Sequence, residues 1–541
     1  MYDIVVHGGS IVDGTGSPWF RADLAIQDGK IAVIGKVPPD QGQTAIDAKG
    51  RIVCPGLIDI HTHSDLTIAV DSRAQSTLAQ GVTTQVAGNC GVSAAPTRDK
   101  RFYYGPLDPS QTEGLVCDWE RMGEYLARLQ RSGVGTNYAT QVGHGNLRAA
   151  TVGYDNRKAT SAEIDRMQRL VAEAMEDGAV GLSSGLAYIP GTYADADEVA
   201  AVAAVVADRG GIYTSHIRNQ TEQIVAAVDE QIEIARRTGI KTHISHMQPG
   251  APVLGCTRQL LVSIDKWRAE GIDVSCDAVP YTIGSTTLKS MLPPWACDGG
   301  DAALIGRLRD RDTREKIKAD TLQHGAESGG SRKRTLIKEG RWDQIWLASA
   351  QRNPALSGKS FREIGAIRGQ DPHDALLDVL IEEEAKPWVL AEDVSEDDVI
   401  NIARHPVGGI MSDGFSLSPE GVLGRGRHHP RSYGAFPRFL RRFVRENQVL
   451  TWESAIHKLT GYAASRFRIA GRGMLREGLW ADVLVFDPRG IVELAAFDDP
   501  YKFPTGIDAV IVNGRIAMQR GMFEASLHGR VLRGVPAQHE D

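Results

Sequence analysis

The sequence predicts an α/β protein built on parallel strands, and three observations support this fold class. Short apolar segments recur from Leu57 onward, and most precede a stretch with helical spacing of apolar residues. Residues 1–54 carry short β-like runs separated by glycine turns, and the chain becomes β-like again after residue 470. Since eight strands alternate with helices, we expect a (β/α)8 barrel of the TIM type, with a doubly wound sheet as the alternative.

Composition limits the classes of protein that fit this chain. Its 541 residues carry a formal net charge of -7, and 42% of them are hydrophobic, which is typical of a globular protein with a large core. No basic tract indicates nucleic acid, and the longest apolar run, 199–207, is too short to cross a bilayer. The chain starts directly with a strand-like run and shows no charged and apolar leader, so we expect a cytoplasmic protein.

The two ends of the chain are predicted to form one small domain. The N-terminal part contains Ile4-Val5-Val6, and the C-terminal part contains apolar runs at 481–487 and 509–514. We expect residues 1–54 and 470–541 to pair as a β-sandwich beside a barrel of residues 55–469.

The barrel strands follow from short apolar segments bounded by turns and polar residues. The eight predicted strands are Leu57–Thr62, Val82–Ala87, Asn137–Val142, Ala179–Ser183, Gly211–Ser215, Lys241–Ser245, Asp273–Cys276 and Val407–Met411. Helical periodicity lies between several of them, as in 161–177 and 221–238. The 130 residues between Cys276 and Val407 are too many for a simple crossover. With charged helical patterns at 301–323 and 374–385, this segment predicts a helical subdomain inserted at 289–400.

Potential metal ligands follow several of these strands. His61 and His63 are two residues apart, so a strand places both imidazoles on one face. The HxH pattern alone is weak, because two histidines in a surface loop are common. Four further ligand types follow other strands, and parallel strands would bring them to the same edge of the sheet: Cys90, His216, His246 and Asp413. Each has a structural explanation by itself, but their joint placement predicts a metal site at the barrel mouth.

Two other features near the predicted strand ends are a histidine and a serine motif. His144 ends the third strand, and we expect it to line the pocket without binding metal. Gly181-Leu182-Ser183-Ser184-Gly185 matches the nucleophile elbow of serine hydrolases, but the following residues have loop character where the elbow needs a helix. A serine hydrolase is therefore a minor alternative.

At these residues the sequence resembles the D-aminoacylase (N-acyl-D-amino-acid deacylase) branch of the amidohydrolase superfamily. The run 55–65, with its His61-Thr62-His63, resembles the first-strand signature of the superfamily. Gly88-Asn89-Cys90-Gly91 is more specific, since this branch has a cysteine where many relatives have a carboxylated lysine or a glutamate. Lys100 and Lys158, the lysines between His63 and His216, do not end a predicted strand. The resemblance covers nearly the whole chain.

The resemblance implies a zinc enzyme with an identified set of ligands. Cys90, His216 and His246 would hold one zinc ion, and His61, His63, Cys90 and Asp413 would form a second, weaker position. Asp413 would act first as general base and then as general acid. Tyr188 or the His61–His63 pair would stabilise the oxyanion.

The substrate carboxylate is bound in this branch by a cluster that includes an Arg, a Ser, a Lys and a Tyr. Arg431 and Ser285 match the first two. Gln248 stands at the lysine position and Val279 at the tyrosine position, so a charge and a hydroxyl are missing. We expect the longer loop 425–428, with its two arginines, to supply a substitute cation.

We therefore expect a zinc-dependent hydrolase that splits an N-acyl-D-amino acid with a neutral or hydrophobic side chain into a carboxylate and a D-amino acid. One alternative, motivated by Gln248 and Val279, is hydrolysis of another amide, a cyclic amide or a carbamate. A non-catalytic metal-binding scaffold protein is the second alternative, and the complete ligand set with Asp413 argues against it. In each enzyme hypothesis the partner is a small molecule.

Overall fold

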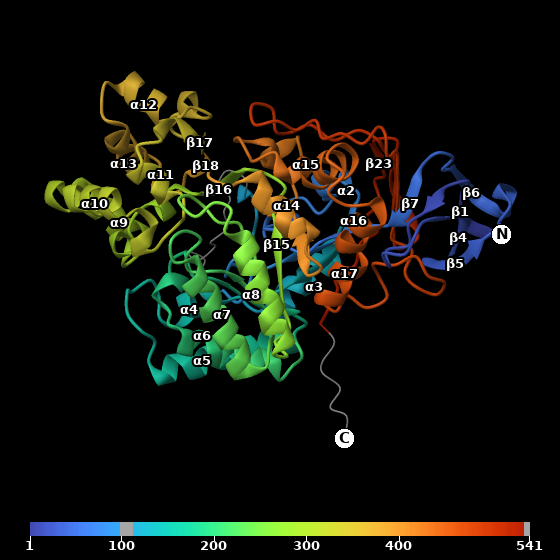
Figure 1. The fold of residues 1–541 in the computed structure, drawn as a ribbon, viewed down its shortest axis with the longest axis horizontal. Coiled ribbons are helices and arrows are strands. Elements are labelled where there is room, and N and C mark those ends of the chain that lie inside the picture. Colours follow the sequence, from blue (N-terminus) through green and yellow to red (C-terminus); the bar gives the residue numbers. More distant parts are fainter. Residues whose placement is uncertain (98–111, 535–541) are drawn as a thin grey trace.

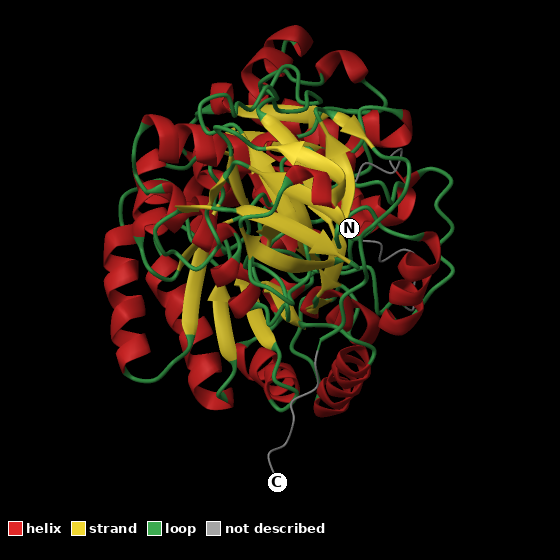
Figure 2. Ribbon diagram, turned by 90° about the vertical axis from the view of Figure 1, so that its right-hand side faces the viewer, coloured by secondary structure: helices red, strands yellow, loops and turns green. Residues whose placement is uncertain are grey.

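Parallel strands lie at the centre of the molecule, and helices surround them (Figure 2). The computed structural model describes residues 1–97 and 112–534. Neighbouring strands pair in parallel in the order β8-β9-β10 and β11-β12-β13-β14-β15-β19, and Gln141 joins β10 to β11. Their bounds are β8 (Leu57–Asp59), β9 (Val82–Ala87), β10 (Asn137–Thr140), β11 (Val142–Gly143), β12 (Gly181–Gly185), β13 (Ile212–His216), β14 (Lys241–Ile244), β15 (Val274–Ala278) and β19 (Gly408–Ile410).

The last strand of this series meets the first just beyond their carboxyl ends. Thr62 and Gly414 form a parallel bridge, in which the His63 amide donates to the Gly414 carbonyl at 2.8 Å. The Asp413 amide donates to the His61 carbonyl at 3.0 Å. The alternation of strand and helix confirms the predicted α/β class, and the structure contains a strand at each of the eight predicted positions, with ends shifted by at most three residues.

The helices between the strands form where the sequence supplies both a cap and an apolar face. Helix α5 (Ser161–Glu176) begins after Thr160, whose hydroxyl accepts from the Glu163 amide while the Glu163 carboxylate accepts from the Thr160 amide. The other helices around the strands are α3 (Met122–Ser132), α4 (His144–Thr151), α6 (Ala196–Ala207), α7 (Ile224–Thr238), α8 (Thr257–Ala269), α14 (Glu396–Arg404), α16 (Trp452–Leu459) and α17 (Gly461–Arg466).

Both chain ends contribute to a pair of sheets at one end of the molecule (Figure 1). One sheet has the order β5-β4-β1-β6 and the other β23-β22-β21-β20-β7-β2-β3. They share a core in which Ile4 and Val6 pack with Val483 and Ile511. The bounds are β1 (Tyr2–His7), β2 (Ser10–Ile11), β3 (Phe20–Arg21), β4 (Asp23–Gln27), β5 (Lys30–Gly35), β6 (Gly42–Asp47), β7 (Ile52–Pro55), β20 (Val483–Phe486), β21 (Ile507–Val512), β22 (Arg515–Gln519) and β23 (Met522–Phe523).

The end of the described chain departs from the predicted terminal domain. Residues 528–534 leave these sheets and run beside β10, where Val531 bridges Tyr138 and the Tyr138 amide donates to the Arg530 carbonyl. The segment lies there because it satisfies main-chain groups that the start of β10 leaves open. The sequence between 524 and 534 contains no apolar alternation that could have indicated this.

The segment between β15 and β19 is not purely helical, contrary to the expectation. It contains an antiparallel sheet of β16 (Ile283–Thr287), β18 (Trp388–Glu392) and β17 (Ile345–Ser349), paired in that order. These strands are separated by more than 35 residues of chain, so no hairpin turn marks their pairing. The helices are α9 (Asp301–Arg309), α10 (Arg311–His324), α11 (Arg334–Lys338), α12 (Phe361–Arg368) and α13 (Pro372–Glu382). We call residues 279–395 the insertion; it has a hydrophobic cluster of its own and projects opposite to the terminal strands (Figure 1).

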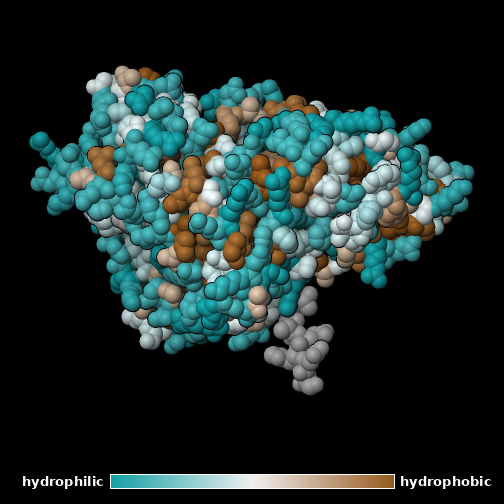
Figure 3. Space-filling view, viewed as in Figure 1, coloured by the Kyte–Doolittle hydropathy of each residue, from teal (hydrophilic) through white to brown (hydrophobic). Residues whose placement is uncertain are grey.

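The face of the molecule seen in Figure 3 is mostly hydrophilic, with apolar patches scattered over its middle. Among the described residues, no helix combines the length and the apolar character needed to cross a membrane.

Candidate metal centre

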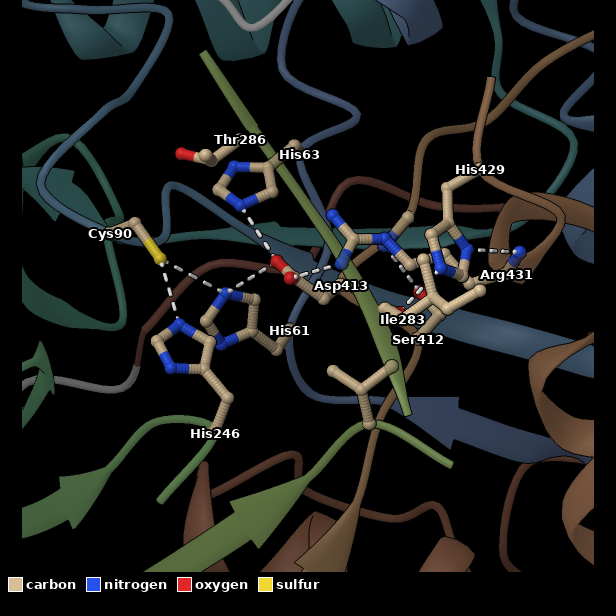
Figure 4. Close-up of polar contacts among 12 residues, drawn as sticks. His61, His63, Cys90, His246, Ile283, Thr286, Ser412, Asp413, His429 and Arg431 are labelled. Atoms are coloured by element: carbon tan, nitrogen blue, oxygen red, sulfur yellow. Dashed lines mark hydrogen bonds and ion pairs between the residues drawn. The ribbon is translucent and has the colours of Figure 1, made fainter. Parts of the chain in front are cut away.

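Four buried side chains bring their ligand atoms together beyond the carboxyl ends of the parallel strands. One ligand atom each of His61, Cys90, His246 and Asp413 lies within 4.8 Å of all the others. The Cys90 sulfur is 3.4 Å from His61 Nε2 and 3.3 Å from His246 Nε2 (Figure 4). His216 joins them, because its Nδ1 is 3.1 Å from His246 Nε2 and 3.8 Å from the Cys90 sulfur. The structure therefore brings together the ligands predicted from separate strands.

The backbone turns sharply at three of these positions. Cys90, His246 and Asp413 have φ angles of 52°, 34° and 53°, in the left-handed region that non-glycine residues avoid. Such a conformation costs on the order of 1–3 kcal/mol per residue and persists where the surroundings impose it, often at functional sites. Asn89 holds one of these turns by donating its side-chain amide to the carbonyls of Thr62 and Val86.

Asp413 connects the histidine pair to a cation. Its Oδ1 lies 3.0 Å from His63 Nε2 and 3.4 Å from His61 Nε2, and its Oδ2 lies 2.6 Å from the Arg431 guanidinium. Burial by itself would raise the pKa of Asp413, but the Arg431 charge and the histidine contacts hold that pKa well below its ordinary value. The carboxylate is therefore anionic at neutral pH.

The chemistry of this donor set fits a zinc-like cation. Burial, helped by the charge of Arg332, lowers the pKa of His216 to about 3, so its imidazole is neutral and can bind metal. Burial also lowers the pKa of His246 and raises that of the Cys90 thiol. Converging neutral nitrogens, a sulfur and a carboxylate without a cation among them would be unfavourable, and imidazole and thiolate are preferred zinc ligands.

A second layer of polar side chains fixes these ligands. Gln220 places its amide nitrogen 3.3 Å from His246 Nδ1 and donates to the His246 carbonyl at 2.7 Å. Asp277 accepts from the His246 amide, and its other oxygen lies 2.9 Å from His243 Nε2. Gln220 follows His216 by four residues in a segment without secondary structure, so no pattern in the sequence indicates its role.

A cavity of about 130 Å³ opens beside the centre. Of the predicted substrate-binding residues, five line it: Tyr188, Gln248, Val279, Ser285 and Arg431. The Tyr188 ring lies 4.5 Å from the His216 ring, and the Tyr188 hydroxyl accepts from the Thr286 hydroxyl at 3.3 Å. The described lining does not include His144, whose Nε2 lies 3.0 Å from the buried Glu198 carboxylate.

The two positions that depart from the D-aminoacylase pattern bond to each other. The Gln248 side chain donates to the Val279 carbonyl at 3.1 Å and accepts from the Val279 amide at 2.9 Å. The side-chain oxygen and one N–H of this amide are thereby used, and Gln248 brings no charge to the position where the branch has a lysine.

The expected substitute cations of the loop 425–428 do not line this cavity. Arg425 pairs with Glu113, and Arg427 donates to the Asp498 carbonyl at 3.2 Å. The loop lies at the surface, where these acceptors are available to the two arginines. Neither lysine considered for the metal site reaches it: Lys158 pairs with Asp195 at 2.8 Å and is 80% exposed, and Lys100 lies outside the described residues.

The serine-hydrolase alternative also fails on geometry. The Ser183 hydroxyl accepts from the Gly91 amide at 3.0 Å, and Ser184 bonds to Tyr213 and Ser215. Neither hydroxyl is bonded to a histidine base among the described residues, as a nucleophilic serine requires.

Comparison with known proteins decides the family. The model of the amidohydrolase family matches residues 44–251 and 405–518. A D-aminoacylase of Alcaligenes xylosoxydans xylosoxydans is 34% identical over 98% of this chain and 97% of its own. This chain belongs to the amidohydrolase family. An N-acyl-D-glutamate deacylase of the same organism is 35% identical over 95% of this chain and 93% of its own, so the resemblance to the D-aminoacylase branch is confirmed.

Solved structures agree with this assignment. An N-acyl-D-glutamate deacylase from Bordetella bronchiseptica, in complex with zinc and a phosphonate inhibitor, has a TM-score of 0.82 and 34% identity over 98% of this amidohydrolase and all of that chain. A D-aminoacylase crystal structure has a TM-score of 0.81 and 31% identity over the same shares. Residues 252–404, which include the whole insertion, lie between the two segments that the family model matches.

Proposed function

We propose that this protein is a zinc-dependent amidohydrolase that splits an N-acyl-D-amino acid, with a neutral or hydrophobic side chain, into a carboxylate and a D-amino acid. The observation that carries this proposal is the convergence of Cys90, His216 and His246 on Asp413 in one buried cavity. It is supported by the names of two relatives, a D-aminoacylase and an N-acyl-D-glutamate deacylase.

The proposal includes the architecture that presents the site. We interpret the parallel strands as a closed (β/α)8 barrel over residues 55–469, with a β-sandwich from 1–54 and 470–527. The strand order and the Thr62–Gly414 bridge support closure. The ligands then lie at the carboxyl ends of the strands, where the active sites of such barrels are found.

Cys90, His216 and His246 would hold one zinc ion, and His61, His63 and Asp413 would form a second, weaker position that shares Cys90. A related D-aminoacylase is described as having a binuclear metal centre, which supports this division. Bound zinc would polarise the scissile carbonyl and lower the pKa of water from about 15.7 towards ~7.

Asp413 carries the proton in the proposed reaction. As the water oxygen bonds to the acyl carbon, Asp413 accepts a proton from that water, and it is anionic beforehand because Arg431 and the histidines stabilise its charge. The carbon–nitrogen bond then breaks, and the same proton passes from Asp413 to the leaving nitrogen. Tyr188, whose ring packs on that of His216 and which lines the cavity, would donate to the oxygen on which negative charge develops.

The apolar residues of the cavity favour an uncharged substituent. The lining includes Val92, Ile189, Leu292 and Pro294, which offer apolar surface to a side chain or an acyl chain. Arg431 and Ser285 also line the cavity and would contact the polar end of the substrate. A second candidate is hydrolysis of an amide or cyclic amide without a carboxylate, which the mutual bonding of Gln248 and Val279 favours.

A hydrolysis panel tests the proposed function. The zinc-loaded protein is given N-acetyl-D-leucine, its L-enantiomer, N-acetyl-D-glutamate and the carboxylate-free N-acetyl-D-leucinamide, and the released amine is quantified. We expect the D-leucine compound to be the best of the four. Preference for leucinamide would favour the second candidate, and release of amine from none of a wider set of amides would favour a scaffold protein.

A further inference from the structure

Two cations of the insertion share a single buried carboxylate at the cavity wall. Arg332 Nε lies 2.6 Å from Asp393 Oδ2, and Lys333 Nζ lies 3.1 Å from the same oxygen. The side chains of Arg332, Lys333 and Asp393 are 10%, 4% and 2% exposed. One positive charge of this trio therefore has no counter-charge within it, and both cations line the cavity.

Arg332 reaches from the insertion to the metal centre. Its Nη1 donates to the Gln220 side-chain oxygen at 2.7 Å and to the Gln248 carbonyl at 3.2 Å. Gln220 in turn contacts Nδ1 of the ligand His246. Within the described residues, these bonds and the Asp393 pair use Nε and Nη1, while Nη2 makes no hydrogen bond.

Gly284 in β16 leaves the space that these charged groups occupy. A Cβ atom at this position would lie 2.7 Å from Lys333 Nζ and 3.5 Å from both Arg332 Nη2 and Asp393 Oδ1. The neighbouring Ser285 also lines the cavity. The cavity lining here thus combines two cationic residues, Arg332 and Lys333, with Ser285 next to Gly284 in β16.

An excess buried cation is unfavourable unless an anion or strong acceptor meets it. The protein offers no obvious further anion at this wall in its described residues: Asp393 is shared, and Asp413 is engaged by Arg431 and the histidines. An anion from solution would complete the arrangement, and a carboxylate matches the fork of a guanidinium.

We propose that Arg332, supported by Lys333, binds the carboxylate of the substrate. The inference rests on the proposed function and deepens it: the substrate is an acylated amino acid with a free carboxylate, and the insertion recognises that group. One carboxylate oxygen accepts from Arg332 Nη2, and Lys333 Nζ and the Ser285 hydroxyl lie on the same wall. Arg332 lies between the two segments that the family model matches.

Arg332→Gln tests this assignment with a pair of substrates. For N-acetyl-D-leucine we expect KM to rise about 10- to 100-fold, because a hydrogen bond to a charged group contributes 1.5–3 kcal/mol. For N-acetyl-D-leucinamide, which has no carboxylate, kcat/KM should stay within a factor of about 2 of wild type. Arg362→Gln is the matched control, because Arg362 lies in the same insertion, pairs with Asp343 and is 58% exposed. This variant should leave the kinetic constants for both substrates unchanged.

Zinc content is measured on every sample, because Arg332 contacts His246 through Gln220. An equal loss on both substrates, or a loss that follows zinc content, would overturn the assignment. If Arg332→Gln does not fold, Arg332→Lys replaces it, because lysine keeps the positive charge but lacks the paired N–H donors of the guanidinium. This variant should raise KM for N-acetyl-D-leucine about tenfold.

A binding measurement distinguishes failure of the proposed function from failure of the carboxylate assignment. If the wild-type protein hydrolyses neither compound, N-acetyl-D-leucine is titrated into the zinc-loaded protein in a calorimeter. Binding by wild type that is lost in Arg332→Gln supports carboxylate recognition by Arg332 even though deacylation is ruled out. Absence of binding to wild type, or equal binding by both proteins, contradicts it.

Discussion

The two walls of the cavity are built in different ways. The metal wall consists of proposed ligands at or just beyond the carboxyl ends of parallel strands, and three of them adopt a left-handed backbone. The insertion wall consists of Gly284, Arg332, Lys333 and Asp393, carried by connections that pack on a separate hydrophobic cluster. The family model matches the segments that hold the metal wall and leaves residues 252–404 unmatched.

This difference indicates that the proposed enzyme binds its metal and selects its substrate with separate parts of the fold. Groups that must hold a cation within a few tenths of an ångström lie on the most rigid part of the fold. Groups that select the substrate lie on a connection that can change without disturbing the strands. If this is correct, substitutions in one wall should leave the function of the other wall unchanged.

Cys90→Ala should have the largest effect, because it removes the sulfur common to both proposed metal positions. We expect zinc content to fall and hydrolysis to drop by more than about 10⁴-fold, since a bound metal contributes several kcal/mol and generates the nucleophile. Cys276→Ala is the matched control: this cysteine is equally buried, on β15, and makes no contact with the ligands. Normal turnover by Cys90→Ala would remove the metal wall from the mechanism.

Asp413→Asn should separate proton transfer from metal binding. We expect the zinc held by Cys90, His216 and His246 to be retained and kcat to fall by ~10²–10⁴-fold, which is the contribution of a positioned general base and acid. Metal analysis and steady-state kinetics on one preparation check both parts. Near-normal kcat with metal bound would show that another group moves the proton.

Gly284→Ala should act on the insertion wall alone. Its Cβ would lie 2.7 Å from Lys333 Nζ, so the ammonium group must move. We expect KM for N-acetyl-D-leucine to rise roughly 3- to 10-fold with kcat and zinc unchanged, since part of a charge-assisted contact is lost. Gly306→Ala is the control: it lies in α9 of the same insertion, and a Cβ there meets nothing within 4 Å. A fall in kcat with unchanged KM would show that the insertion wall and the metal wall do not act independently.

Lys458→Met should change stability without changing catalysis. Lys458 lies outside the cavity lining and donates to the carbonyls of His405 and Gly408 at 2.6 and 2.8 Å, which anchors the start of β19. Its loss leaves these acceptors unpaired, and we expect the free energy of unfolding to fall by about 1–3 kcal/mol. Denaturant titration at constant pH measures this.

The pH dependence of the same variant provides a second readout. Burial lowers the pKa of Lys458 from 10.5 to about 8, so folding penalises its charged form below pH 8. Between about pH 8 and 10.5 the unfolded chain binds more protons than the folded one, and this group therefore makes stability rise with pH. Lys458→Met should lack that rise; an unchanged slope would mean that the lysine is not responsible for it.

The metal wall could be predicted from the sequence because strand periodicity is local. His61 and His63 are two residues apart, and Cys90, His216, His246 and Asp413 each follow an apolar run, so the topology of parallel strands brings them together. His144 shows the limit of the same reasoning. It also follows a strand, but α4 begins at this residue and carries the ring to Glu198 on α6.

The insertion wall could not be predicted in this way. Arg332 and Lys333 precede a helix of five residues in a segment without strong periodicity, and their position depends on the pairing of β16 with β18 across the insertion. Gln248 and Val279 were identified as departures from the family pattern, but their mutual hydrogen bonds depend on main-chain geometry. The loop 425–428 carries similar charges and was the more obvious source of a cation, yet it pairs at the surface.

A zinc titration of the metal-free protein tests the central claim most directly. The protein is stripped with a chelator, zinc is added back in steps, and bound metal and N-acetyl-D-leucine hydrolysis are measured on each sample. We predict that hydrolysis is absent without metal, returns in proportion to zinc bound at the first site, and does not return in Cys90→Ala. Full hydrolysis by the stripped protein, or recovery that is independent of Cys90, would contradict a deacylase built on this metal centre.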